Sequence, residues 1–230
     1  MRRSGQSPTI VALLAAGLVY SFPAFAENLA LTGAEVGAAG SRYIYAGTVL
    51  RPSGDSPWRM RLWLDETRYR YDKNGATVRA QERGAEAAAG LGGAGDNSWW
   101  AAYLGLRYDH AELSPDDRAN DSRGGHLRTK LQAESEQGVG NWRANLGAAY
   151  VFGADKYWLR GRMMYPLAPY SLLGVELLRH GGPDYTATQL GGVFSLPLGG
   201  RSTALVKGGL RHDENRGSGG YAGIELSLPY

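Results

Sequence analysis

Apolar and polar side chains alternate along several short stretches of this sequence, and this period of two is the pattern of a β-strand with two different faces. The clearest stretch is 126–136. One of its faces carries Leu127, Thr129, Leu131, Ala133 and Ser135, and the other carries His126, Arg128, Lys130, Gln132, Glu134 and Glu136. Similar stretches follow one another with turn-like breaks between them, which is typical of an antiparallel meander.

Three further stretches begin and end their apolar face with an aromatic residue. The aromatic pairs stand eight residues apart and are Trp100 with Tyr108, Trp142 with Tyr150, and Tyr157 with Tyr165. At about 3.3 Å per residue and a strand tilt near 40°, this spacing covers about 20 Å along the membrane normal, close to the apolar band of an outer-membrane barrel. We therefore predict that the apolar face contacts lipid and that the charged face lines the lumen. A water-soluble barrel with the two faces reversed is the alternative, because alternation alone does not identify the inner face.

The strand pattern predicts an all-β fold, a transmembrane antiparallel up-and-down β-barrel of about 12 strands. The expected strands are 29–37, 41–51, 58–71, 77–91, 98–111, 126–136, 141–152, 157–165, 170–179, 185–196, 202–212 and 219–230. The first of these is weak and the stretch Val78 to Leu91 is mixed, so ten strands are the alternative. The longest connection, Leu113 to Gly125, is expected at the outer surface, which places both termini in the periplasm.

Residues 1–26 predict a signal peptide. Arg2 and Arg3 form a positive start, the apolar run 10–22 is too short for a stable membrane helix, and Ala24-Phe25-Ala26 has the small-x-small pattern of a cleavage site. Residues 27–230 are then expected to form a single outer-membrane barrel domain. The last strand ends on Tyr230, and it resembles the aromatic-ended terminal strand by which outer-membrane proteins are recognised for assembly. The predicted localisation is the outer membrane of a Gram-negative cell.

Composition excludes several other classes of protein. The chain has no cysteine, which excludes a disulfide framework and thiolate metal sites. It has 25 Lys and Arg against 22 Asp and Glu, and two of the arginines lie in the predicted signal peptide, so the mature chain is nearly neutral and no nucleic-acid partner is expected. After residue 26 no run of apolar residues is long enough to predict a membrane-spanning helix.

The predicted lumen face gathers many charged side chains. They are Arg59, Arg61, Asp65, Arg107, Arg128, Lys130, Glu134, Arg143, Arg160, Arg162, Glu176, Lys207 and Glu225. Enclosed charges must be paired or hydrated. They form either an interlocked plug or the wall of a narrow hydrated path for an anionic or hydroxyl-rich solute, and a twelve-strand barrel lies between packed and open barrels in size.

The same face also carries four aromatic residues, Trp63, Trp99, Tyr103 and Trp158. Flat aromatic rings are the surfaces on which sugar rings stack, and neighbouring arginines can donate hydrogen bonds to hydroxyl groups. The candidate glycan contacts are therefore these four residues with Arg107, Arg128, Arg160 and Arg162. The alternative is that the aromatic side chains only fill space.

Neither a metal site nor a catalytic site is predicted. The four histidines, His110, His126, His180 and His212, are expected at the outer rim or in loops, and their spacing matches no metal-binding motif. No serine near a histidine has the context of a nucleophile, and no Walker loop, dinucleotide fingerprint or H-E-x-x-H motif occurs. We therefore expect no cofactor, no metal and no enzymatic activity.

Three stretches resemble the cellulose biosynthesis BcsS family of alphaproteobacteria. They are Tyr45-Ala46-Gly47-Thr48-Val49, Leu113-Ser114-Pro115-Asp116-Asp117 and Tyr157-Trp158-Leu159-Arg160-Gly161-Arg162, and the likeness runs from about Tyr43 to the end. The resemblance implies a non-enzymatic outer-membrane accessory protein of cellulose or exopolysaccharide biosynthesis or export. A glucan chain or cellulose secretion components are then the expected partners, beside outer-membrane lipid and lipopolysaccharide. A general small porin or structural barrel unrelated to polysaccharide is the alternative.

Overall fold

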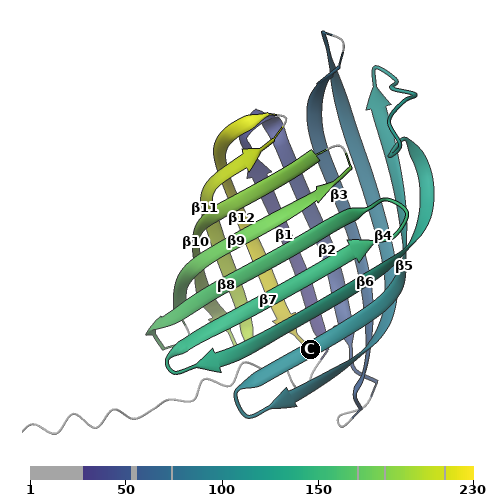
Figure 1. Cartoon of the computed structure of the whole chain (residues 1–230). Coiled ribbons are helices and arrows are strands. Elements are labelled where there is room, and N and C mark those ends of the chain that lie inside the picture. Colours follow the sequence, from purple (N-terminus) through teal and green to yellow (C-terminus); the bar gives the residue numbers. More distant parts are fainter. Residues whose placement is uncertain (1–27, 53–55, 74, 170, 184, 215) are drawn as a thin grey trace, which may run out of the picture.

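Twelve antiparallel strands close into one barrel in the computed structural model (Figure 1). The structure describes residues 28–52, 56–73, 75–169, 171–183, 185–214 and 216–230, so the predicted signal peptide over 1–26 lies outside the described residues. The strands are β1 (Leu29–Gly37), β2 (Ser41–Leu50), β3 (Trp58–Lys73), β4 (Ala76–Gly95), β5 (Ser98–Ser114), β6 (Gly124–Val139), β7 (Trp142–Val151), β8 (Lys156–Ala168), β9 (Ser171–Gly182), β10 (Tyr185–Gly199), β11 (Ser202–Asp213) and β12 (Gly217–Pro229). The predicted fold and its twelve strands are confirmed, and the ten-strand alternative is wrong.

Pairing between the first and last strands closes the barrel. β1 pairs with β12 over its whole length, from Leu29 opposite Pro229 to Gly37 opposite Tyr221. The Tyr230 amide donates to the Asn28 carbonyl oxygen (2.9 Å) at the edge of this seam. Both ends of the described chain therefore lie at one end of the barrel, and the connection 115–123, the longest between described strands, lies at the other (Figure 1). Because barrels of this kind keep short turns in the periplasm, we assign the end with the termini to the periplasm and the other end to the outer surface.

The apolar stripe of each strand points outward. Leu104, Leu131 and Leu146 expose 60%, 48% and 60% of their surface, whereas their strand neighbours Gln132 and Asn145 are buried inside the barrel. The prediction of lipid-facing apolar residues is confirmed, and the water-soluble alternative with reversed faces is wrong. A closed barrel with an apolar exterior is the architecture of the bacterial outer membrane. Among the described residues no helix is long and apolar enough to cross a membrane.

Aromatic residues mark both edges of the apolar band. The Trp142 and Tyr165 rings lie 5.1 Å apart at the periplasmic edge, on β7 and β8. Eight residues along the same two strands, Tyr150 pairs directly with Tyr157 at the outer edge. These rings stand where the two aromatic girdles of a membrane barrel are expected.

The barrel wall is taller on one side. β3, β4, β5 and β6 have 16 to 20 residues each, whereas the other strands have 9 to 15. Figure 1 shows the β3–β4 hairpin rising beyond the rest of the outer rim. The Ala-rich part of β4 pairs with β3 and β5 without a shift of register. The register shifts instead near Pro166 in β8 and Pro197 in β10, because proline has no amide hydrogen to donate to a neighbouring strand.

The barrel interior is mainly polar, with one small apolar cluster. Met164, Leu172 and Val193 are buried together toward the periplasmic ends of β8, β9 and β10, and Leu205 of β11 packs against them. This cluster lies near the periplasmic end of the barrel. The buried charged residues of the interior lie elsewhere along the inner wall.

Candidate functional site in the lumen

The lumen contains a cavity of about 1530 Å³. Its lining extends from Asn28 and Pro229 at the periplasmic end to Asp117 and Asn120 at the outer end, so it follows the length of the barrel. The eight candidate contact residues all line it: Trp63, Trp99, Tyr103, Arg107, Arg128, Trp158, Arg160 and Arg162. Arginines and lysines outnumber aspartates and glutamates in the lining, which favours ligands that accept hydrogen bonds.

A first network of charges lies along β3, β4 and β6. Arg61 contacts the Glu86 carboxylate, and its Nη1 also donates to Gln132 Oε1 (3.0 Å). Lys130 Nζ donates to the second oxygen of Glu86 (2.6 Å). Glu86 is buried and receives two cations, so the solvation that it loses on burial is replaced by charge-assisted hydrogen bonds.

Arg107 belongs to the same wall and is held by two carboxylates. Its Nη1 and Nη2 donate to the two oxygens of Asp65 (2.7 and 2.9 Å), and Nη2 lies 2.8 Å from Asp109 Oδ1. Such a fork of parallel hydrogen bonds fixes the guanidinium plane. Arg107, a predicted glycan contact, is therefore part of the barrel wall, and its donors are largely used within the protein.

A second network crosses the closure seam. Arg162 of β8 contacts Glu176 of β9, and its Nη2 donates to Glu225 Oε1 of β12 (2.6 Å). Lys207 Nζ of β11 lies 3.3 Å from Glu225 Oε1 and 2.9 Å from Glu35 Oε2 of β1. Arg162, like Arg107, therefore uses its donors within the protein. The network connects strands on both sides of the β1–β12 seam.

Two of the four candidate arginines have no carboxylate partner. In the part of the chain that the structure describes, no acidic group lies within 4 Å of the Arg128 or Arg160 side chain. Arg128 stands opposite Arg107 in register, but Asp65 and Asp109 are taken by Arg107. Arg160 Nη2 donates to Asn145 Oδ1 (3.1 Å), and its Nε has no partner. Both guanidinium groups can therefore donate to a ligand in the lumen.

Two of the four candidate aromatic residues are packed against other side chains, and the other two line the cavity. Trp63 stacks on Tyr45 (ring centroids 4.6 Å apart), and Arg61 Cζ lies 4.1 Å from its ring centre. Trp63 is thus packed into the wall, and Tyr103 is almost fully buried. Trp99 and Trp158 line the cavity as half-buried side chains near the periplasmic and the outer end respectively.

Trp158 lies over Gly147 of β7. A Cβ atom at Gly147 would approach the ring to 2.8 Å, so a glycine is required for this ring position. Arg160 Cζ lies 5.0 Å from the ring centre, which brings a flat surface and a hydrogen-bond donor together. This pair is the arrangement closest to the predicted sugar-contacting site.

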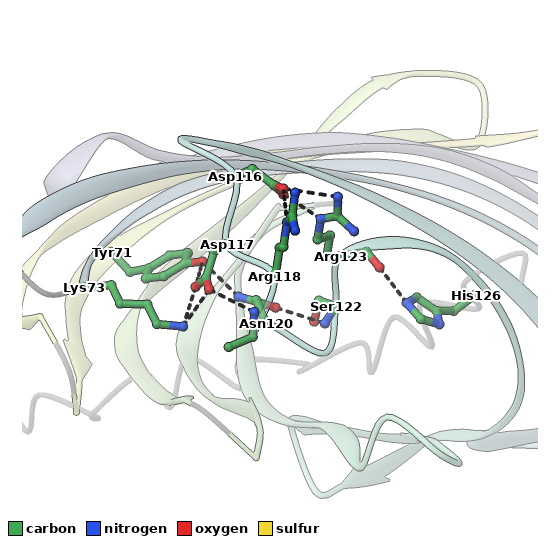
Figure 2. A network of polar contacts seen from close by, with 10 residues as sticks. Tyr71, Lys73, Asp116, Asp117, Arg118, Asn120, Ser122, Arg123 and His126 are labelled. Atoms are coloured by element: carbon green, nitrogen blue, oxygen red, sulfur yellow. Dashed lines mark hydrogen bonds and ion pairs between the residues drawn. The ribbon is translucent and has the colours of Figure 1, made fainter.

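The outer mouth is partly covered by the connection 115–123, whose polar contacts are drawn in Figure 2. Asp117 accepts hydrogen bonds from Lys73 Nζ (2.6 and 2.8 Å) and from the Tyr71 hydroxyl (2.8 Å). Asn120 Nδ2 donates to the Tyr71 hydroxyl (3.0 Å). The hydrogen bond from Lys73, with further help from Tyr71 and the Ala119 amide, lowers the pKa of Asp117 below its ordinary value. The connection is therefore fastened to the end of β3.

Contacts across the mouth were not expected from the sequence. Lys156 Nζ at the start of β8 donates to Glu82 Oε1 of β4 (2.6 Å). Arg216, which follows β11, lies over the Tyr69 ring of β3 at 5.1 Å. These residues have no recognisable sequence signal, because their contacts depend on how far strands on opposite walls approach one another.

All four histidines lie in strands near the outer rim. His110, His126, His180 and His212 belong to β5, β6, β9 and β11, so the rim position is correct and the loop alternative is wrong. His180 lines the cavity, and His126 contacts the Arg123 carbonyl oxygen (2.9 Å). Within the described ranges, no group of three His, Cys, Asp or Glu side chains is arranged to hold a metal ion.

The comparison with protein families gives one match. The family described as cellulose biosynthesis protein BcsS matches residues 30–230, which is nearly the whole chain. No curated protein is detectably similar to the sequence.

Solved structures share the fold at low sequence identity. The KdgM porin is 11% identical with a TM-score of 0.51, covering 87% of this chain and 99% of its own. An outer-membrane channel from Pseudomonas putida F1 is 12% identical with a TM-score of 0.53, covering 93% and 98%. The translocator domain of the autotransporter NalP from Neisseria meningitidis is 10% identical with a TM-score of 0.54, covering 89% and 88%. These likenesses concern the barrel fold alone.

Proposed function

Because the chain belongs to the cellulose biosynthesis protein BcsS family, we propose that it is a non-enzymatic outer-membrane accessory protein of cellulose or related exopolysaccharide production. Its role in this proposal is to contact the glucan chain inside the barrel. The family and the barrel fold support an accessory role at the outer membrane. The finer assignment to glucan contact rests on the chemistry of the lumen.

The observation that carries the proposal is that half-buried aromatic rings and arginines without a carboxylate partner line one cavity. Trp158 and Arg160 lie side by side near the outer end, Trp99 lines the periplasmic end, and Arg128 lines the cavity from the outer half of β6. A glucose ring offers a flat apolar face to an aromatic ring and hydroxyl groups to hydrogen-bond donors. An extended glucan has these features at every unit, so it can use contacts spaced along the barrel.

The size of the cavity supports a polymer segment over a single small solute. Sites for small molecules have volumes of about 300–1,000 Å³. The lumen cavity, at about 1530 Å³, exceeds this range and follows the barrel axis. A chain segment of several sugar units would fill it better than one sugar.

A general small porin is the second candidate function. The likeness to the KdgM porin and to an outer-membrane channel favours it, and a structure of KdgM in complex with disordered oligogalacturonate has 10% identity to this chain. Conductance in a planar bilayer distinguishes the two. A general porin conducts small ions and is indifferent to cello-oligosaccharides, whereas the proposed glucan-contacting barrel is blocked or bound by them.

The test of glucan contact removes the two accessible rings. The variant Trp99→Ala/Trp158→Ala is expected to lower cellulose output and to weaken cello-oligosaccharide binding at least tenfold, because stacking contributes up to about 1.5 kcal/mol per ring beyond area burial. Trp100→Ala is the matched control, since Trp100 adjoins Trp99 but faces the lipid. Heat-modifiable gel migration establishes that each variant is a folded barrel. Unchanged cellulose output together with unchanged oligosaccharide binding in the folded double variant would remove glucan contact from the proposal.

A further inference from the structure

The outer side of β2, β3 and β4 carries five arginines just above the apolar band. They are Arg42, Arg68, Arg70, Arg79 and Arg83, whose strand positions are all on the outward face, although the mouth of the lumen cavity also reaches Arg42 and Arg70. Below them on the outward face, Ile44 follows Arg42 on β2, and Leu64 of β3 is separated from Arg68 by Glu66; Ile44 and Leu64 expose 48% and 62% of their surface. The outward face thus changes from apolar to charged residues at this level, as is expected near the outer edge of the apolar band of a membrane barrel.

One carboxylate, that of Glu66, lies within 4 Å of three of the five arginines. Glu66 accepts a hydrogen bond from Arg68 Nε (2.6 Å) and one from Arg83 Nε (3.3 Å), and Arg42 Nη2 lies 3.9 Å away. Over the described ranges, no acidic group lies within 4 Å of the Arg70 or Arg79 side chain. Asp72 and Glu112 also stand on the outward face beside the patch, so its five arginines leave a net positive charge against three carboxylates.

The strand register places like charges directly opposite each other. Arg42 of β2 pairs with Arg68 of β3, and Arg70 of β3 pairs with Arg79 of β4. Such pairs destabilise a sheet, because the side chains of directly opposed residues lie about 5 Å apart. An anion bound between the two guanidinium groups of a pair would attract both of them and offset their mutual repulsion.

We propose that the basic patch binds the phosphate groups of an anionic glycolipid in the outer leaflet, with the acyl chains of that lipid on the apolar band below. Two residues of a tilted strand rise about 5 Å along the membrane normal, so Arg42 and Arg83 stand at the level where headgroup phosphates begin. Guanidinium groups bind phosphate oxygens in pairs. On β9 at the same rim, by contrast, Arg179 is a single exterior arginine with Glu214 3.9 Å away.

The test measures binding of diphosphorylated lipid A to the purified full-length barrel in detergent. Arg42→Gln/Arg68→Gln removes the like-charge pair together with the hydrogen bond from Arg68 to Glu66, and the Glu66 carboxylate keeps its contacts with Arg83 and Gln81. Because a surface ion pair contributes little to stability, the thermal midpoint without lipid is expected to change little. Lipid A is expected to bind at least tenfold more weakly than to the unmodified protein. Arg179→Gln is the matched control and is expected to bind lipid A normally.

Two further probes identify the ligand. Dephosphorylated lipid A and inorganic phosphate are each expected to give much less thermal stabilisation than lipid A. Equal stabilisation by the dephosphorylated lipid would assign binding to the apolar band alone, and equal stabilisation by inorganic phosphate would indicate a site for the free ion. Lipid A binding within twofold of normal in the double variant would also overturn the proposal. If the double variant fails to fold, Arg83→Gln takes its place with the same expected direction.

Discussion

At the level of single residues, position in a strand determines which way a side chain points, but it does not determine which side chain it meets. Alternation placed Arg107, Arg128, Arg160 and Arg162 on the inner face, and all four line the cavity. Their partners depend on the stagger between strands and on side-chain reach. For this reason the sequence could not separate Arg107 and Arg162, which are held by carboxylates, from Arg128 and Arg160.

The position of Trp63 depends on a glycine. A Cβ atom at Gly47 would lie 2.1 Å from Trp63 Cε3 and 2.8 Å from the Leu62 carbonyl oxygen. Gly47→Ala is therefore expected to lower the free energy of unfolding by about 1–3 kcal/mol through overpacking. At Gly161 the nearest atom is 3.7 Å from the added Cβ, so Gly161→Ala is expected to be neutral or to stabilise by about 0.5 kcal/mol. Urea unfolding in lipid vesicles measures both, and equal effects would contradict the packing assigned to Trp63.

Glu176 is the most buried charge of the seam network. It is fully buried and lies between Arg162 and Lys207. Glu176→Gln removes the charge and is expected to lower the free energy of unfolding by about 2 kcal/mol, because Glu225 can only partly replace it. Glu112→Gln, at an exposed position, is expected to change it by less than about 0.5 kcal/mol. The same urea titration distinguishes them, and a Glu176 variant as stable as the Glu112 variant would show that the network contributes little.

At the level of elements, strands were predicted well and connections poorly. β1 has the expected bounds although its sequence pattern is weak, and pairing with β12 and β2 along its whole length holds it in the barrel. β4 is longer than expected at both ends, since its alternating glycines and alanines carry little hydrophobic contrast. The connection 115–123 has no periodicity, and Asp117 meets Lys73, which is 44 positions away in the sequence. Such contacts depend on the closed barrel and cannot be obtained from local patterns.

The fastening of the connection 115–123 is expected to depend on pH. The pKa of Asp117 is lowered in the folded state, chiefly by Lys73, and the pKa of Asp116 is lowered by Arg123. Both carboxylates therefore stabilise the folded connection above the ordinary aspartate pKa of about 3.9, and this stabilisation is lost as the pH falls through the lowered values. A spin label at Arg118→Cys is expected to be restrained at pH 7 and to gain mobility only below about pH 4.

The variant Asp117→Asn provides the control for this pH dependence. It cannot carry the charge that Lys73 recognises, so the label at position 118 is expected to be mobile already at pH 7. A label with the same restraint at pH 7 in both backgrounds would show that Asp117 does not hold the connection.

At the level of the whole molecule, the sequence could predict closure but not the interior volume. An even number of two-faced strands and an aromatic-ended last strand are enough to predict a membrane barrel. Whether its lumen is filled depends on side-chain packing: here Met164, Leu172 and Val193 fill part of one wall while a cavity remains beside them. The charges pair along the walls and leave a cavity between the walls, and a hydrated path for a solute through this cavity stays a prediction.

The central claim is that the apolar stripe faces lipid and the charged stripe faces the lumen, and spin-label accessibility in a bilayer tests it most directly. The chain has no cysteine, so single labels can be placed at Leu104→Cys, Leu131→Cys and Leu146→Cys outside, and at Gln132→Cys and Asn145→Cys inside. We predict that the first three labels collide mainly with oxygen dissolved in lipid and the last two mainly with a water-soluble nickel chelate. The claim would be contradicted if the three leucine positions were shielded from both reagents while positions 132 and 145 were exposed to water around the protein.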